Sequence, residues 1–184
     1  MRQSNDALAD DFRDFIECLN AHAVVFVLVG GYAMGWHGVV RATGDIDFLY
    51  QRIKENVEHL CAALREFGAP EDFIDPEFLL SSNAVTQIGN EPLRIDLLGD
   101  ITGVTFADVH AGADEIELNG NHLLVIGIEG LRANKAATHR AKDKDDLRRL
   151  ARAVTASTKR PAGSKKRAAR SSVAKPLAPP GKKK

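Results

Sequence analysis

Two aspartates separated by one residue, Asp45 and Asp47, lie inside an otherwise apolar stretch that ends at Tyr50. Side chains alternate between faces along a strand, so both carboxylates are predicted to share one face while Ile46 and Phe48 point into the core. Two neighbouring carboxylates repel each other unless a cation lies between them, and Mg²⁺ prefers hard oxygen ligands of this kind. The spacing therefore predicts a metal site, with exposed carboxylates on an edge strand as the plainer alternative.

A third aspartate, Asp96, lies in a similar apolar run and is predicted to bring another carboxylate from a neighbouring strand. Three carboxylates around one or two Mg²⁺ ions are typical of sites that move a phosphoryl or nucleotidyl group. Asp96 is also a candidate partner for Arg94, which shares its face, and the two roles are compatible.

An apolar run at residues 24–29 ends in Gly30 and Gly31, where the chain is expected to turn into a helix. Backbone N–H groups at such a helix start are suited to binding phosphates. The alternative is an ordinary strand-to-helix turn, for which glycine pairs are common.

Together, Gly30-Gly31, Asp45-x-Asp47 and Asp96 resemble the signature of the polymerase-beta-like nucleotidyltransferase superfamily. The surrounding residues look most like its small bacterial branches, which include abortive-infection toxin nucleotidyltransferases and the aminoglycoside and lincosamide nucleotidyltransferases. These surroundings are Tyr32, His37-Gly38 and Arg41-x-Thr43. Residues 135–147 are similar to the Lys-plus-Asp helix that closes the domain in toxin-like members. The resemblance covers residues 22–150.

The resemblance implies an α/β (equally, α+β) nucleotidyltransferase fold, a small mixed sheet with helices packed mainly on one side. It implies an enzyme that transfers a nucleoside monophosphate from an NTP such as ATP to a hydroxyl group, with Mg²⁺ or Mn²⁺ as cofactor. The implied metal ligands and catalytic residues are Asp45, Asp47 and Asp96, of which Asp96 also helps to deprotonate the acceptor hydroxyl. The implied nucleotide-binding residues are Gly30, Gly31, Arg41, Thr43 and Lys135.

Several of these residues have plainer interpretations. Arg41 is equally suited to pairing with the acidic surface. Thr43 is suited to tightening its loop, and His37 is suited to packing or hydrogen bonding. A lysine on a helix, such as Lys135, is usually solvated. The charged residues after it are interpreted first as an ion-paired surface that joins two helices; they are Arg140, Lys142, Asp143 and Asp146.

The acceptor is left open: tRNA, a protein side chain, an antibiotic or another small molecule. One alternative function is a catalytically silent relative that binds a partner, for example in a toxin–antitoxin pair. Retention of three mutually repulsive carboxylates disfavours that alternative. Another is an antibiotic nucleotidyltransferase, but those enzymes usually append a substantial helical substrate domain, and only about 25 residues of predicted helix follow Gly127 here.

Charge is distributed unevenly along the 184 residues. Ten of the 25 basic residues lie at positions 155–184, which hold no acid, so residues 1–154 contain 15 basic and 25 acidic residues. We expect one nucleotidyltransferase-like domain at residues 1–154 and a disordered basic tail at residues 155–184. Such a tail attracts nucleic acid without reading its sequence, or only solubilises the protein.

The chain contains two cysteines, Cys18 and Cys61, both in helix-like patterns. They suggest no disulfide framework and fit a reducing cytoplasm. The N-terminal stretch is acidic and lacks the apolar segment of a signal peptide, and no apolar run approaches the roughly 20 residues that span a bilayer. We therefore expect a cytoplasmic protein without a membrane partner.

The elements that must position these residues follow from hydrophobic periodicity and turn signals. A helix is predicted to begin near Tyr32, and further helices are expected at residues 6–20, 53–67, 106–111, 128–138 and 142–154. Strands are predicted at residues 24–29, 45–50, 84–88, 93–98, 114–118 and 122–126, with hairpin turns at 89–92 and 119–121. Residues 70–76 are expected to form a loop, with Phe73, Phe78, Leu79 and Leu80 packing back onto the core.

Overall fold

The computed structural model describes residues 9–40, 42–118 and 120–158. Within these residues the chain forms six strands and seven α-helices, and a short 3-10 helix at Glu71–Phe73. In chain order the strands and α-helices are α1 (Asp10–Ala21), β1 (Phe26–Val29), α2 (Gly30–Trp36), β2 (Asp45–Tyr50), α3 (Lys54–Phe67), α4 (Pro76–Leu80), β3 (Val85–Ile88), β4 (Arg94–Leu98), α5 (Phe106–Ala111), β5 (Asp114–Leu118), β6 (Asn121–Val125), α6 (Ile128–Ala137) and α7 (Ala141–Thr158).

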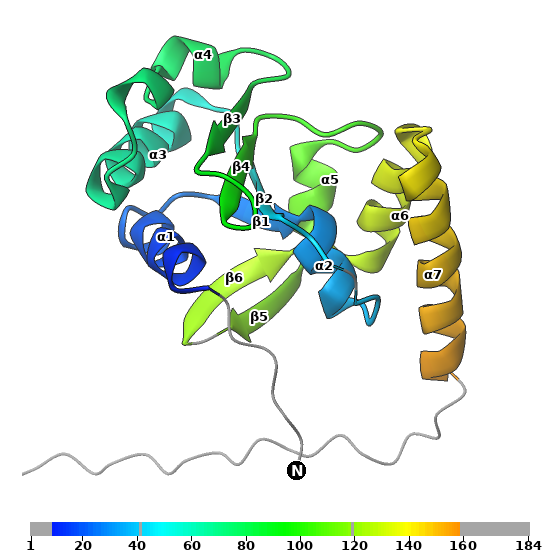
Figure 1. Cartoon of the computed structure of the whole chain (residues 1–184). Coiled ribbons are helices and arrows are strands. Elements are labelled where there is room, and N and C mark those ends of the chain that lie inside the picture. The colour runs from blue at the N-terminus through cyan, green and yellow to red at the C-terminus, as the bar shows by residue number, and fades with distance from the viewer. Residues whose placement is uncertain (1–8, 41, 119, 159–184) are drawn as a thin grey trace, which may run out of the picture.

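The six strands form one mixed sheet in the order β3-β4-β2-β1-β6-β5 (Figure 1). The pairs β2–β4 and β1–β6 are parallel, whereas β1–β2, β3–β4 and β5–β6 are antiparallel. Both predicted hairpins are therefore confirmed. The parallel pairing of β4 with β2 matters most for the site, because it places Asp96 directly beside Asp47.

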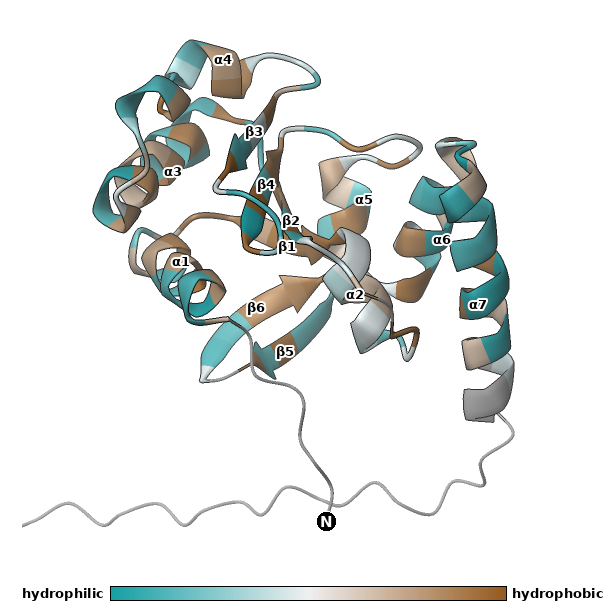
Figure 2. Cartoon of the chain, in the orientation of Figure 1, coloured by the Kyte–Doolittle hydropathy of each residue, from teal (hydrophilic) through white to brown (hydrophobic). Residues whose placement is uncertain are grey.

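One face of the sheet packs against α1 and α3 through aromatic side chains. The ring of Phe48 on β2 lies 5.6 Å from that of Phe15 on α1 and 5.5 Å from that of Phe26 on β1, measured between centroids. All three side chains are buried. Figure 2 shows hydrophobic residues on the central strands and a largely hydrophilic outer helix, α7. Burial of this aromatic cluster anchors β2, the strand that carries Asp45 and Asp47.

The opposite face of the sheet is partly covered as well. Helices α5, α6 and α7 lie on the other side from α1 and α3 (Figure 1), with Val109 of α5 and Leu131 of α6 buried. The expected small mixed sheet is confirmed, but helices lie on both sides of it rather than mainly on one. This second layer of helices matters for the site, because residues of α6 and α7 line the same cavity as the three carboxylates.

The predicted elements agree with the structure except around residues 70–80 and at the end of α7. Residues 76–80 form α4, which the sequence analysis placed outside any helix, and Asp75 caps it by accepting N–H groups from Glu77 and Phe78. Leu79 is buried as predicted, but Phe73 and Phe78 are 37% and 45% exposed, so their predicted packing was wrong.

The last helix, α7, continues to Thr158, four residues past its predicted end at Val154. It continues because residues 155–158 contain no helix-breaking glycine or proline. Arg41 and most of the basic tail, residues 159–184, lie outside the described residues. Cys18 and Cys61 are free thiols. Among the described residues, no helix is both long and apolar enough to cross a membrane.

Candidate active site

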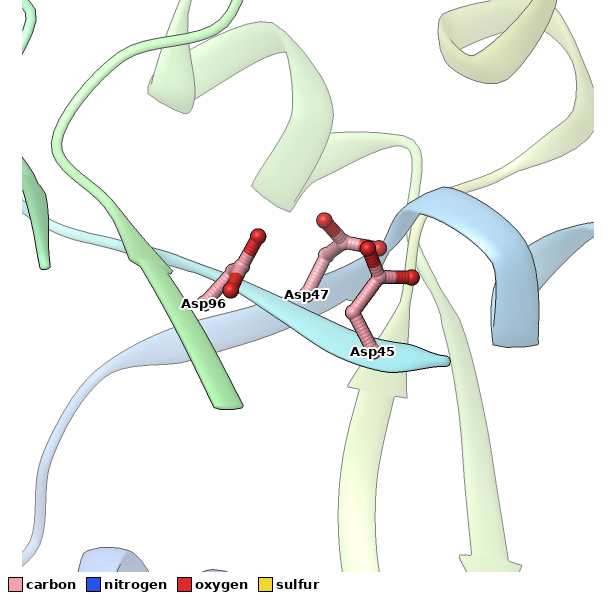
Figure 3. Close-up of side chains that lie close together, drawn as sticks. All are labelled: Asp45, Asp47 and Asp96. Atoms are coloured by element: carbon pink, nitrogen blue, oxygen red, sulfur yellow. The ribbon is translucent and has the colours of Figure 1, made fainter. Parts of the chain in front are cut away.

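Three carboxylates on β2 and β4 converge at the cavity that residues of α6 and α7 also line. Asp45 and Asp47 project from the same face of β2, and Asp96 projects beside them from β4 (Figure 3). One oxygen from each carboxylate lies within 4.8 Å of the other two. The alternation that buries Ile46 and Phe48 completely turns the two aspartates of β2 toward this cavity. The structure thus brings together the three aspartates predicted from the sequence.

These carboxylates fit a hard divalent cation. All three donors are oxygens, and two oxygens bound to one Mg²⁺ lie about 3–4 Å apart because each Mg–O bond is about 2.1 Å long. The observed spread of up to 4.8 Å is wider than that geometry, so the three carboxylates would have to draw closer together around a bound ion. Burial of Asp96, at 7% exposure, also removes water that would otherwise screen the repulsion between the charges.

Arg94 forms ion pairs with two members of the triad, Asp45 and Asp96. Its Nη2 donates to Asp45 Oδ2 at 2.6 Å, and its Nε donates to Asp96 Oδ1 at 2.7 Å. The predicted pairing of Arg94 with Asp96 is confirmed, and the contact with Asp45 extends it across two strands. Gln87 on β3 adds a hydrogen bond from Nε2 to Asp96 Oδ2 at 3.2 Å.

Asp47 receives no contact from Arg94 among the described hydrogen bonds and ion pairs. Its Oδ2 accepts the N–H of Gly31 at 3.4 Å. Burial raises the pKa of Asp47 from its ordinary value of 3.8 to about 6, and the charges of Asp45 and Asp96 add to the effect. The Gly31 N–H and the charge of Lys135 oppose it only partly. Asp47 is therefore the carboxylate of the triad with the clearest need for a cation.

The glycine pair forms the turn from β1 into α2. Gly30 has a φ of +64°, which a residue with a side chain rarely adopts. Thr43, predicted to bind nucleotide, donates its hydroxyl to Asp45 Oδ1 at 2.6 Å and lies against Gly31. Thr43 thus orients a carboxylate of the triad, which also agrees with its predicted role in tightening the loop. His37 is a hydrogen-bonding residue as expected, since its Nε2 lies 2.8 Å from the carbonyl oxygen of Ile126.

The side chain of Lys135 is largely covered and paired, which corrects the interpretation of a solvated helical lysine. Its Nζ lies 2.7 Å from Asp143 Oδ1 and 3.3 Å from Asp146 Oδ2, and all three side chains are at most 10% exposed. The predicted ion-paired surface between two helices is therefore a buried cluster joining α6 to α7. Burial alone would raise the pKa of Asp143, but hydrogen bonds from Lys135 and Thr138, with the charges of Lys135 and Arg140, lower it.

A cavity of about 460 Å³ connects these groups. One wall carries the triad with Gly30 and Gly31, and the opposite wall carries Lys135, Arg140 and Lys142. Sequence analysis missed Gln87 and placed Arg140 and Lys142 in a charged surface. Register along the β3–β4 hairpin would have found Gln87, because it lies directly opposite Asp96.

Comparison with known proteins agrees with this geometry. A family model described as nucleotidyl transferase of unknown function (DUF2204) matches residues 8–173. No curated protein matches the sequence. The structure resembles the antibiotic-resistance factor ANT(2'')-Ia with a TM-score of 0.51 and 13% identity, over 80% of this chain and 84% of that one. This likeness shows that the fold is that of a nucleotidyltransferase.

Two further solved structures are similar at lower scores. A putative nucleotidyltransferase from Thermotoga maritima, TM1012, gives a TM-score of 0.48 and 16% identity, over 85% of this chain and 95% of that one. The lincosamide antibiotic adenylyltransferase LnuA gives 0.47 and 13%, over 80% of this chain and 98% of that one.

Proposed function

This chain belongs to the family of nucleotidyl transferases of unknown function (DUF2204), and we propose that it moves a nucleoside monophosphate from an NTP to a hydroxyl acceptor with the help of a divalent cation. The observation that carries the proposal is the convergence of Asp45, Asp47 and Asp96 within 4.8 Å at the wall of one cavity. Oxygen-only ligands favour Mg²⁺, with Mn²⁺ as a substitute.

The two walls of the cavity suit the triphosphate of a nucleoside triphosphate. Lys135, Arg140 and Lys142 offer positive charge to the phosphates, and Gly30 and Gly31, which carry no side chains of their own, line the same cavity. Lys135 is held in place by Asp143 and Asp146, so it loses little freedom when it binds phosphate. The α-phosphate is then placed next to the triad.

In the proposed reaction, the acceptor hydroxyl oxygen attacks the α-phosphorus and forms the new P–O bond. The bond from the α-phosphorus to the bridging oxygen of the β-phosphate breaks, and pyrophosphate leaves with that electron pair. Asp96 takes the hydroxyl proton. Mg²⁺ bound by the triad would neutralise the charge that develops on the phosphate oxygens.

The acceptor is proposed to enter from the side of β3. Asp96, the proposed base, lies on β4 next to that strand, and Val85 and Gln87 of β3 line the same cavity. Val85 is 46% exposed, so this side is open to solvent. An open entrance suits an RNA or protein hydroxyl as well as a small molecule.

Incorporation of label tests the function directly. The protein is incubated with each α-³²P-NTP, Mg²⁺ and cell lysate, and label is expected in one class of macromolecule or small molecule. Parallel reactions with γ-³²P-NTP should leave the acceptor unlabelled, because the γ-phosphate departs in pyrophosphate. Labelling from γ-³²P-NTP would show phosphoryl transfer instead.

Matched variants identify the site. Asp45→Asn with Asp47→Asn should abolish labelling and metal-dependent nucleotide binding in calorimetry. Asp11→Asn with Asp72→Asn, which changes two exposed carboxylates that do not line the cavity, should preserve both. Unchanged nucleotide binding in the first variant would reject the triad as the metal site.

The toxin-type role is part of the proposal and is supported by the resemblance of the paired helices after Gly127 to toxin-like members. It predicts that induced expression of the wild-type protein arrests bacterial growth and that expression of the Asp45→Asn, Asp47→Asn variant does not. Growth arrest by both proteins would argue against nucleotidyl transfer as its cause.

A further inference from the structure

Arg94 occupies the position that a metal ion would share between two strands. Resting on the proposed function, we propose that Arg94 is a built-in counter-ion that competes with the divalent cation for Asp45 and Asp96. It would hold the triad together when no metal is bound, weaken the binding of metal alone, and couple metal binding to nucleotide binding.

The geometry assigns this role to the guanidinium. Nη2 lies 2.6 Å from Asp45 Oδ2 and 3.2 Å from Asp96 Oδ2, and Nε lies 2.7 Å from Asp96 Oδ1. Arg94 therefore contacts both oxygens of Asp96 and one oxygen of Asp45. The remaining oxygen of Asp45 accepts the Thr43 hydroxyl. Every oxygen of these two aspartates thus has a donor.

A cation cannot simply be added to this arrangement. Its positive charge would repel the guanidinium across a distance of a few ångströms, in surroundings where Asp96 is only 9% exposed at its side chain. At least one contact from Arg94 must be released before two carboxylates can bind metal. The Asp45 contact breaks first, since it is a single hydrogen bond, whereas Asp96 receives two from Arg94.

The released guanidinium has partners at hand. Nη1 already contacts Glu91 Oε1 at 3.1 Å, and the Glu91 side chain is 66% exposed. Arg94 also lines the cavity, where a bound triphosphate would offer further negative charge. The nucleotide would thereby favour the arrangement that metal requires, and metal and nucleotide would bind cooperatively.

Two measurements on Arg94→Met test the proposal without using activity. In EDTA, the thermal midpoint should fall by several degrees, because three carboxylates remain close together without a positive charge. In calorimetry with Mn²⁺ alone, the variant should bind at least tenfold more tightly than the wild type. Mn²⁺ should also raise its thermal midpoint more than that of the wild type.

Arg132→Met is the matched control, since Arg132 pairs with Glu129 on the surface of α6. It should change neither Mn²⁺ affinity nor the effect of EDTA. Arg94→Lys provides a second test if Arg94→Met does not fold. A single ammonium cannot reproduce the bidentate contacts, so Mn²⁺ affinity should lie above that of the wild type.

The outcomes separate this inference from the function on which it rests. If the wild type binds Mn²⁺ with nucleotide but neither Arg94 variant binds Mn²⁺ alone more tightly, competition by Arg94 is wrong and the metal site stands. If no metal binds to the wild type even with nucleotide, the proposed function itself fails. Equal stability of Arg94→Met and the wild type in EDTA would reject the counter-ion role.

Discussion

The carboxylate of Asp47 occupies the space that a side chain at position 30 would need. An ideal Cβ on Gly30 would lie 1.9 Å from Asp47 Oδ2, far inside van der Waals contact. The two residues meet because β1 runs antiparallel to β2 and places Val29 opposite Asp47. The glycine pair and the Asp-x-Asp motif, which are separate in the sequence, therefore form one packed unit.

Gly30→Ala should disrupt this unit through both the clash and the positive φ. We expect a loss of about 1–3 kcal/mol in the free energy of unfolding, measured in urea, together with loss of labelling activity. Gly35→Ala is the control, because nothing lies within 4 Å of its ideal Cβ. Alanine there should preserve stability or raise it by up to about 1 kcal/mol. Similar behaviour of the two variants would show that the clash at Gly30 is relieved without cost.

The raised pKa of Asp47 predicts how stability depends on pH without metal. Between its ordinary pKa of 3.8 and about 6, folded Asp47 retains a proton that the unfolded chain has released. The contribution of Asp47 to stability is therefore complete below pH 3.8 and is lost as pH rises through about 6. In EDTA, Asp47→Asn should be more stable than the wild type at pH 7.5 by up to about 2–3 kcal/mol. The difference in urea unfolding should shrink toward pH 4; a constant difference would contradict the raised pKa.

Asp96→Asn should affect turnover more than nucleotide binding, since the proposed role of Asp96 includes accepting the hydroxyl proton. We expect labelling to fall by at least about 100-fold while calorimetry retains most of the NTP affinity. Gln87→Ala removes only the hydrogen bond to Asp96 Oδ2 and should cost much less activity. Labelling by Asp96→Asn near the wild-type rate would make Asp96 a structural partner of Arg94.

Sequence patterns predicted the parts of the site that depend on local geometry. Strand alternation alone places Asp45 and Asp47 on one face, and the β3–β4 hairpin follows from its turn. The parallel docking of β4 beside β2 is a long-range pairing that periodicity cannot reveal; the apolar flanks of Asp96 indicated a third strand carboxylate, and the resemblance to a known family placed it with the other two. The helix α4 was missed because five residues are too few to show periodicity, although Asp75 followed by Pro76 is a helix-start signal.

Lys135 shows most clearly what the sequence could not reveal. Its position on α6 gives no sign of burial, because the side chains that cover and pair with it come from α7. Helical periodicity describes one helix at a time, whereas the packing of α6 against α7 decides whether a charge is exposed. The same limit explains why Asp143 and Asp146 were expected in a surface cluster.

The buried cluster should make α7 important for stability. Asp143→Asn leaves Lys135 with Asp146 as its remaining charged partner and should lower the free energy of unfolding by about 1–3 kcal/mol at neutral pH. Because the pKa of Asp143 is lowered in the folded state, its contribution is present above pH 3.8 and is lost as pH falls below that value. Urea unfolding across that range measures the effect.

Asp145→Asn is the control for this prediction. Asp145 is also on α7, but it is 47% exposed at its side chain and pairs with Arg149 at 2.7 Å. An exposed pair of this kind contributes about 0.2–1 kcal/mol. Equal losses in the two variants would show that burial adds nothing to the Asp143 pair.

Truncation of the chain after α7, which ends at Thr158, tests whether the folded domain needs the basic residues that follow. Residues 159–184 hold ten lysines and arginines, no acids and no aromatic side chains. Truncation after Thr158 should preserve the thermal midpoint and NTP affinity, because the described core lies entirely before that residue. It should weaken binding to RNA and DNA at low salt, measured by fluorescence anisotropy with unrelated sequences.

A variant that keeps the tail length but replaces its lysines and arginines with glutamine distinguishes the effect of the positive charge from the effect of the polypeptide itself. If the tail acts by releasing counterions from nucleic acid, this variant should bind as weakly as the truncated protein, and only the wild type should lose affinity steeply as salt rises. Undiminished RNA binding after truncation would place the nucleic-acid surface on the acidic body, where 25 acidic residues outnumber 15 basic ones. Such a surface would have to be a small basic patch on this acidic body. The cavity wall with Lys135, Arg140 and Lys142 would be the first patch to test.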